Sequence, residues 1–236
     1  MTSPEDAQRV REGLNRAVFA NHLAELLRVQ EINCVIDVGA HTGEFGKLLR
    51  GVGYAGLIAS FEPVSSSFDA LEAVMAAQPP WVGHRVALGA AAGEEEITVS
   101  EDTSFSSLGE PSEWGRRTFP GIRPGSTETV AVERLDALYA GLLEEVPDPR
   151  VLLKIDAQGS EWDVLEGAAD SLRRVRVVQV EAAVIPVYEG VRPYTEVIEH
   201  LGEAGLKLSG LFPVSRDRDL RIVELDCVLV RPGSAG

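Results

Sequence analysis

Short apolar runs alternate with helical patterns along most of this chain of 236 residues. The apolar runs are rich in β-branched and aliphatic residues, and they read as buried strands at 33–38, 56–61, 82–88, 151–155 and 176–181. Apolar residues at helical spacing separate these runs at 42–50, 65–76 and 160–172. Strands that are joined through helices run parallel, and helices cover both faces of their sheet. The sequence therefore predicts an α/β fold with a doubly wound, mostly parallel sheet.

The two ends of the chain extend this pattern. Residues 1–30 should hold an N-terminal amphipathic helix, because apolar residues recur there at helical spacing. A helix near 193–204 precedes two further strands, near 206–212 and 222–230, with no helix between them. These last two strands should form an antiparallel hairpin at the edge of the sheet, which brings the number of strands to seven.

One segment departs from the alternation. Strand candidates at 95–99 and 128–132 flank a stretch from 101 to 127 that is rich in Gly, Pro, Ser and Thr. We therefore expect a small β/loop insertion at 94–133 within a single domain that spans 1–236. A loop of this length in a compact domain is typically a lid, a binding loop or a disordered segment. We interpret 101–127 as a candidate lid, with a mobile solvated insertion as the alternative.

Composition limits the partners. The 22 Lys and Arg residues against 37 Asp and Glu residues give a formal net charge of −15, which repels the phosphates that dominate nucleic-acid binding. The uncharged stretch 51–61 is far shorter than the roughly 18 apolar residues of a spanning helix, and the first residues lack the basic head of a secretory signal. Cys34 and Cys227 lie in strand-like runs and read as buried thiols. We expect a cytoplasmic protein that binds neither nucleic acid nor membranes.

The turn after the first predicted strand indicates a ligand site. It contains Asp37, Gly39, His41, Thr42 and Gly43, and ligands of doubly wound sheets bind at the carboxyl ends of the strands. The spacing is not the GxGxxG of a dinucleotide fingerprint. A carboxylate at Asp37 also disfavours a pyrophosphate, whereas it suits a cationic amino-acid group such as that of S-adenosylmethionine. These five residues are therefore candidates for cofactor binding.

The next two strands supply further cofactor candidates. Glu62 and Pro63 follow the second strand, where a carboxylate can accept hydrogen bonds from both ribose hydroxyls of a nucleoside. The alternative is that Glu62 only caps the following helix. The third strand ends at small or aliphatic residues, Ala87 and Leu88, which leave room for an adenine ring.

Three blocks of sequence resemble the FkbM family of S-adenosylmethionine-dependent methyltransferases. They are the segments 37–43 (DVGAHTG), 61–63 (FEP) and 154–168 (KIDAQGSEWDVLEGA), with Ala157 and Ser160 as departures from the family pattern. The resemblance implies a seven-stranded, Rossmann-like class I methyltransferase fold. It also implies methyl transfer to a hydroxyl of a small molecule, commonly a sugar or a polyketide-type natural product. It leaves the oligomeric state open, a homodimer included.

An alcohol must lose its proton during methyl transfer, which requires a base or a metal ion. Asp156, at the carboxyl end of its strand, is the first candidate for the base and also lies near the cofactor; its alternative is a structural role in the turn at Gly159. His41 and Glu181 are further candidates. Asp156, Glu181 and Asp226 also form a candidate site for a divalent cation such as magnesium, because these oxygen ligands suit a hard cation.

Candidates for acceptor binding are Ser106, Ser107, Trp114 and Tyr188. The two serines lie in a stretch that resembles the serine-rich segment before the lid of family members, where hydroxyls could bind cofactor or acceptor. Tyr188 lies in a stretch that resembles the family's acceptor-side loop, and Trp114 lies in the candidate lid. A surface position for Tyr188 remains open. Two other functions also remain open: a noncatalytic cofactor-binding or scaffold protein with the same fold, and a nicotinamide-dependent oxidoreductase.

Overall fold

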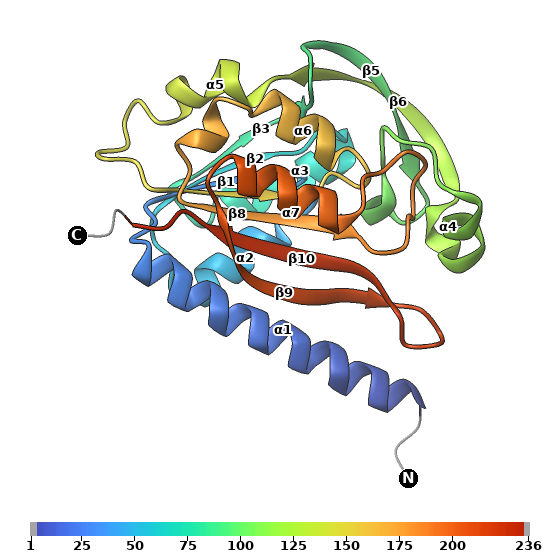
Figure 1. Cartoon of the computed structure of the whole chain (residues 1–236). Coiled ribbons are helices and arrows are strands. Elements are labelled where there is room, and N and C mark those ends of the chain that lie inside the picture. Colours follow the sequence, from blue (N-terminus) through green and yellow to red (C-terminus); the bar gives the residue numbers. More distant parts are fainter. Residues whose placement is uncertain (1–3, 234–236) are drawn as a thin grey trace.

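A seven-stranded sheet forms the centre of the molecule in the computed structural model, which describes residues 4–233 (Figure 1). The strand order is β3 (Trp81–His84), β2 (Leu57–Phe61), β1 (Cys34–Val38), β7 (Val151–Ile155), β8 (Val177–Ala183), β10 (Ile222–Val230) and β9 (Lys207–Arg216). The pairs from β3 to β8 are parallel, and β10 is antiparallel to both β8 and β9. The predicted doubly wound sheet and its antiparallel edge hairpin are confirmed.

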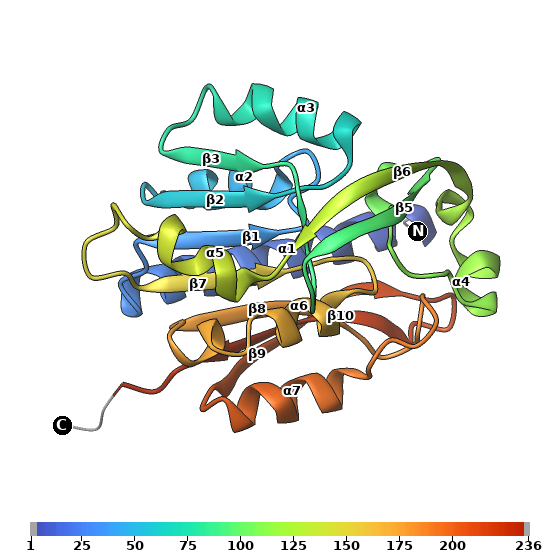
Figure 2. The ribbon, with the colours of Figure 1, turned by 90° about the horizontal axis from the view of Figure 1, so that it is seen from above.

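Helices cover both faces of this sheet (Figure 2). One hydrophobic core joins the sheet to α1 (Pro4–Val29), α2 (Glu44–Gly51) and α3 (Ser65–Met75). The other joins it to α5 (Leu135–Leu142), α6 (Glu161–Gly167) and α7 (Tyr194–Glu203). Side chains alternate between these cores along each strand, as Val35 and Ile36 do. None of the described helices is both long and apolar enough to cross a membrane.

The predicted third strand is wrong beyond His84. The chain turns after β3, and β4 (Ala87–Leu88) pairs instead with β6 (Pro124–Glu133) in a second, smaller sheet of order β4-β6-β5. In this sheet β5 (Gly93–Ser100) and β6 are antiparallel. The apolar run at 82–88 therefore contributes a strand to each of the two sheets, because β2 pairs with it only as far as His84.

The candidate lid segment is folded. It contains the 3-10 helix η1 (Thr103–Phe105), helix α4 (Glu113–Thr118) and the 3-10 helix η2 (Pro120–Ile122). These elements surround a hydrophobic cluster that the sequence did not predict, with Ile122, Val187, Tyr188 and Val223 at its centre and Phe105, Trp114 and Phe119 packed against it. The segment thereby has a core of its own, and it lies at the end of the main sheet where the parallel strands finish (Figure 2).

Two predicted helices differ in detail. The helix predicted at 160–172 ends at Gly167, and the 3-10 helix η3 (Ser171–Arg173) follows. A Cβ at Gly167 would lie 2.0 Å from the carbonyl oxygen of Gly89, so the chain approaches too closely there for a larger residue. In α1, the second half is buried through Phe19, Leu23, Leu26 and Leu27. Three apolar residues that precede Phe19 in the helix, Val10, Leu14 and Val18, are exposed instead.

Candidate functional site

The backbone amides of the turn between β1 and α2 donate hydrogen bonds to the end of β2 and to Glu62. The amides of Gly39 and Ala40 both donate to the carbonyl of Phe61 at 3.0 Å, and the amide of His41 donates to Glu62 Oε2 at 2.8 Å. Gly39 has a φ of +71°, and a Cβ there would lie 1.7 Å from the carbonyl oxygen of Asp156. The turn therefore needs a glycine for close contact with the chain that leaves β7.

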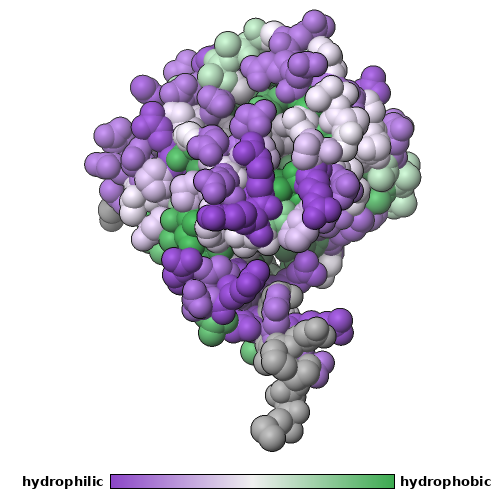
Figure 3. Space-filling model, turned by 90° about the vertical axis from the view of Figure 1, so that its right-hand side faces the viewer, coloured by the Kyte–Doolittle hydropathy of each residue, from purple (hydrophilic) through white to green (hydrophobic). Residues whose placement is uncertain are grey.

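A large cavity of about 1180 Å³ opens at the carboxyl ends of the parallel strands. On this face of the molecule, hydrophobic surface lies recessed between hydrophilic side chains (Figure 3). Ten of the predicted site residues line this larger cavity: Gly39, His41, Glu62, Pro63, Ala87, Leu88, Ser106, Asp156, Glu181 and Asp226. The strand-end rule thus brings together residues from seven separate segments of the chain.

Glu62 is the best-defined carboxylate in this cavity. It is only 6% exposed, and its two oxygens accept the amides of His41 and Val64, at 2.8 and 2.9 Å. Burial raises its pKa, and the two backbone hydrogen bonds oppose this shift. A carboxylate has about four acceptor positions. Two therefore remain for a ligand, so helix capping occupies only part of this group.

Asp37 does not lie in the cavity. Its side chain is fully buried beneath the glycine turn, where Oδ2 accepts the hydroxyl of Ser60 at 3.1 Å and Oδ1 lies 3.1 Å from Lys154 Nζ. The expected direct contact between Asp37 and a cofactor is therefore wrong in this structure. The reason is that β7 places a buried cation beside β1, which sequence spacing does not reveal.

Lys154 connects this buried pair to the cavity. Its ammonium donates to the carbonyls of Val38 and Gly39, at 3.2 and 2.8 Å, and lies 3.7 Å from Asp156 Oδ2. Burial by itself lowers the pKa of Lys154, but the charges of Asp37 and Asp156 outweigh this effect and raise it. Lys154 therefore remains charged and fixes the turn against the end of β7.

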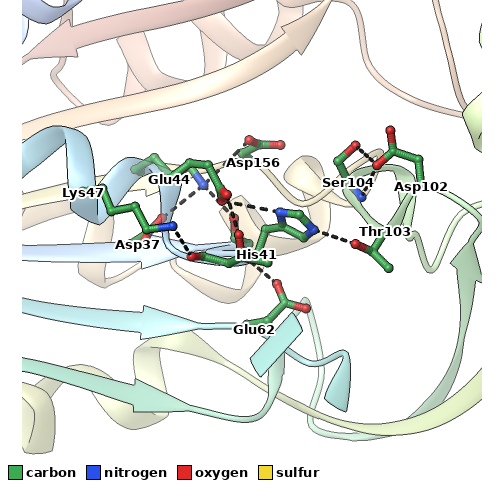
Figure 4. A network of polar contacts seen from close by, with 12 residues as sticks. Asp37, His41, Glu44, Lys47, Glu62, Asp102, Thr103, Ser104 and Asp156 are labelled. Carbon is green, nitrogen blue, oxygen red and sulfur yellow. Dashed lines mark hydrogen bonds and ion pairs between the residues drawn. The ribbon is translucent and has the colours of Figure 1, made fainter. Parts of the chain in front are cut away.

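His41 links the glycine turn to the insertion (Figure 4). Its Nε2 lies 2.8 Å from Thr103 Oγ1 in η1, and its Nδ1 lies 3.4 Å from Glu44 Oε2. Both ring nitrogens thus have partners, which argues against His41 as the base. Thr42 donates its hydroxyl to Glu44, and Gly43 donates its amide to the carbonyl of Ala40. In the described part of the chain, neither Thr42 nor Gly43 lines the cavity, so their expected direct contacts are absent.

A smaller cavity of about 480 Å³ adjoins the larger one, and Glu181 lines both. Tyr188 lines the smaller cavity. It is buried rather than on the surface, at 3% exposure, and its hydroxyl lies 3.1 Å both from the carbonyl of Phe105 and from Gln158 Oε1. Tyr188 therefore forms part of the wall between the insertion and the turn that follows β7.

Two of the predicted acceptor residues are structural. Ser107 is buried, donates its hydroxyl to the carbonyl of Gln158 and accepts the amide of Gly109. Trp114 packs edge-on against Phe119 within the insertion, with ring centres 5.9 Å apart. Neither residue lines one of the two cavities described above. The predicted contacts of Ser107 and Trp114 with an acceptor are therefore corrected, because these side chains contact other residues of the protein instead.

The predicted metal site is not formed. Asp156, Glu181 and Asp226 line one cavity, as expected. However, no group of three or more His, Cys, Asp or Glu side chains within residues 4–233 lies in an arrangement that could hold a metal ion. Asp156 is instead in contact with Lys154 and accepts a hydrogen bond from Gln158 Nε2 at 2.9 Å.

Sequence reasoning missed three polar residues beside the site: Lys154, Gln179 and Glu224. A signal for them exists, because side chains two apart on a strand share a face. Gln179 precedes Glu181 by two residues, and Glu224 precedes Asp226 by two. The structure pairs Glu181 with Asp226 across β8 and β10, and Lys154 with Gln179 across β7 and β8.

Comparisons with known proteins agree with this architecture. A family model described as "Methyltransferase FkbM domain" matches residues 37–208. Methyltransferase sdnD of Sordaria araneosa is 24% identical over 225 residues, which cover 86% of this chain and 82% of that protein. The range matched by the family model includes the glycine turn, Glu62 and the segment around Asp156.

Solved structures share the fold at low identity. A DUF574 family protein from Streptomyces avermitilis has a TM-score of 0.52 at 14% identity, covering 92% of this chain and 82% of that one. A protein from Thermobifida fusca has a TM-score of 0.55 at 7% identity, covering 94% and 82%. At such low identity these likenesses bear on the fold alone.

Proposed function

Because this chain belongs to the FkbM family of S-adenosylmethionine-dependent methyltransferases, we propose that it transfers the methyl group to a hydroxyl oxygen of a small metabolite, such as a sugar or a polyketide-type compound. The fold is that of the class I methyltransferases. What the proposal adds is the acceptor atom, the acceptor class and the role of each residue in the larger cavity.

One observation carries this proposal: Glu62 and Asp156 line the same cavity on either side of the glycine turn. Glu62 follows β2, Asp156 follows β7, and β1 with its turn lies between them. The two free acceptor positions of Glu62 suit the two hydroxyls of a ribose. Asp156 then lies toward the other end of the bound nucleoside, where the methyl group would be.

The cavity also has room for two molecules. Its volume of about 1180 Å³ exceeds the ~300–1,000 Å³ of a typical pocket for one ligand. Aliphatic residues of β4 and β5 (Ala87, Leu88 and Ile97) line one part of it and suit an adenine ring. When bound, S-adenosylmethionine supplies an activated methyl group, so the protein has to position the acceptor and exclude water.

Asp156 is the proposed base. Its carboxylate lies 3.7 Å from the ammonium of Lys154 and is oriented by a hydrogen bond from Gln158 Nε2. About a third of its side chain is exposed, so an acceptor can reach it. In this role Asp156 accepts the hydrogen bond of the acceptor hydroxyl, aligns the oxygen lone pair with the methyl group, and takes up the proton that the hydroxyl loses.

The glycine turn disfavours a nicotinamide dinucleotide. Such cofactors are bound by free amides of the turn, which donate to the pyrophosphate. Here the amides of Gly39, Ala40 and His41 are already bonded within the protein. The family match likewise argues against an oxidoreductase. A noncatalytic protein would bind the cofactor without transferring its methyl group, and the following assay tests this alternative.

The test is incubation with S-adenosylmethionine labelled in the methyl group and a panel of hydroxylated acceptors, followed by mass spectrometry and NMR of the product. We expect label on an oxygen of one acceptor class. Tight binding of S-adenosylhomocysteine without transfer to any sugar, polyketide or other hydroxylated compound would favour the noncatalytic alternative. Label on nitrogen or carbon would contradict O-methylation while leaving the family assignment intact.

A further inference from the structure

Hydrogen-bond acceptors gather where β8 ends and the antiparallel strand β10 begins, beyond Asp156. Glu181 of β8 lies opposite Asp226 of β10, and Glu224 lies two residues from Asp226 on the same face. The three carboxylates are partly buried. Within residues 4–233, none of them forms an ion pair with an arginine, lysine or histidine. With Gln179, they make up a group that we call the acidic corner.

Gln179 shows that the acidic corner lacks a donor. Its side chain is only 5% exposed and lines the larger cavity. Its Nε2 donates to Asp226 Oδ1 at 3.1 Å, whereas its Oε1 is buried with no hydrogen-bond partner among the described residues. Buried amide oxygens are normally paired. A ligand that donates hydrogen bonds would satisfy this oxygen and the neighbouring carboxylates together.

Lys154, which pairs with Gln179 across β7 and β8, does not supply that donor. Lys154 Nζ is already in contact with Asp37, with two backbone carbonyls and with Asp156. Burial raises the pKa of Glu181, Glu224 and Asp226, in the last case to about 6, and the neighbouring carboxylates add to the rise. The carboxyls of the corner therefore bind protons more readily than ordinary carboxyls do, and a cation bound beside them would favour their ionised forms.

We infer that the acidic corner binds a protonated amino group of the acceptor, so that the acceptor is an amino alcohol whose hydroxyl lies beside Asp156. This inference rests on the proposed function. Glu181 lines both cavities, so the ammonium group lies at their junction and the rest of the acceptor extends into the smaller cavity. An ammonium carries three donors and no acceptor, which matches the unpartnered oxygen of Gln179 and the ionised forms of the carboxyls beside it.

The acidic corner lies apart from the glycine turn. Adjacent strands are ~4.8 Å apart, and β7 lies between the turn of β1 and the corner on β8 and β10. The corner is thus ~10–14 Å from the turn across the sheet. The cofactor cavity residues Glu62 and Gly39 belong to the β1–β2 side, and the corner belongs to the acceptor side.

The test uses ethanolamine, which is protonated at pH 7, and its neutral counterparts ethylene glycol and N-acetylethanolamine. Each is titrated by ligand-observed NMR into the full-length protein with S-adenosylhomocysteine bound. We expect ethanolamine to bind at least tenfold more tightly than either neutral compound. We also expect the double variant Glu181→Gln, Glu224→Gln to lose this preference, while Glu199→Gln, an exposed carboxylate on α7, retains it.

Equal binding of the three compounds, or an unchanged preference in the double variant, would overturn the inference. A wild-type protein that binds magnesium ion but not ethanolamine would also overturn it, if the double variant loses the magnesium binding. Thermal melts verify that the double variant is folded, and Asp226→Asn, tested in parallel, should also weaken ethanolamine binding. Binding of S-adenosylhomocysteine should be unchanged in all variants. Failure of that binding in the wild type would count against the proposed function, independently of the amine result.

Discussion

Lys154 Nζ lies 3.1 Å from Asp37 Oδ1, and both side chains are buried where β1 and β7 lie side by side. The same ammonium group holds the carbonyls of Val38 and Gly39 and approaches Asp156. One cation thus connects the base of the glycine turn to the carboxylate that we propose as the base. This buried ion pair organises the site from beneath, although Asp37 itself does not line the cavity.

Replacing Lys154 tests this organisation. Lys154→Met should lower the free energy of unfolding by ~3–5 kcal/mol, because Asp37 would remain buried without its counter-charge. Adding Asp37→Asn should recover part of the loss. Denaturant unfolding of both variants measures the effect, with Lys207→Met, at an exposed position on β9, as control. A Lys154→Met protein as stable as the control would mean that the pair is dispensable.

Gly39 should tolerate no side chain. In Gly39→Ala, the Cβ would collide with the carbonyl of Asp156 at a positive φ, and we expect a loss of about 3 kcal/mol or more. Gly141→Ala in α5 is the matched control, because a Cβ there meets nothing within 4 Å. That substitution should stabilise the helix by ~0.5–1 kcal/mol. Similar melting temperatures for the two variants would contradict the close approach.

Glu62 should determine cofactor affinity. Glu62→Gln retains the side-chain volume but replaces one acceptor oxygen by a donor, so that the ribose hydroxyls lose a partner. We expect S-adenosylhomocysteine to bind ~10–100-fold more weakly, about 1.4–2.7 kcal/mol. Isothermal titration calorimetry measures this, with Glu72→Gln, an exposed carboxylate of α3, as control. Unchanged affinity would remove Glu62 from the cofactor site.

Asp156 should act in the transfer step. Asp156→Asn should reduce kcat by ~10²–10⁴-fold, the usual contribution of a positioned base. Binding of S-adenosylhomocysteine should change little, because Glu62 and the turn are retained. Single-turnover kinetics together with calorimetry separate the two effects. A variant that retains full turnover would show that the proton leaves by another route.

Asp226 should make stability depend on pH. Burial raises its pKa to about 6 in the folded protein, against an ordinary value of 3.8. The folded state therefore holds the proton more tightly, and this stability is present below about pH 4 and lost as the pH rises through about 6. Asp226→Asn should consequently gain ~1–3 kcal/mol relative to wild type between pH 4 and pH 7.

Chemical denaturation across this pH range measures the difference between variant and wild type. Glu199→Gln, at an exposed position on α7, should show no such trend. If the advantage of Asp226→Asn were the same at pH 4 and pH 7, the carboxylate would not be titrating in that window.

Much of the architecture followed from local pattern. Apolar runs and helical spacing predicted each strand of the main sheet and the hairpin of β9 and β10, because burial of one face imposes a period of two or 3.6 on the chain. The same rule located Glu62 and Asp156 at strand ends, and both line the larger cavity. The boundary of β3 was wrong because its run of apolar residues continues into a second sheet.

The sequence by itself therefore determined the order of the elements and which residues lie at the strand tips. Only the tertiary structure decided which of those residues face the cavity. Asp37 is buried because Lys154 lies beside it, and Glu224 joins Glu181 because β10 pairs with β8. Ser107 is bonded to Gln158, and Trp114 packs within the folded insertion. Periodicity states which face a side chain occupies on its own strand. The charges and walls around that side chain come from distant segments, and the packing of the sheet and insertion brings them together.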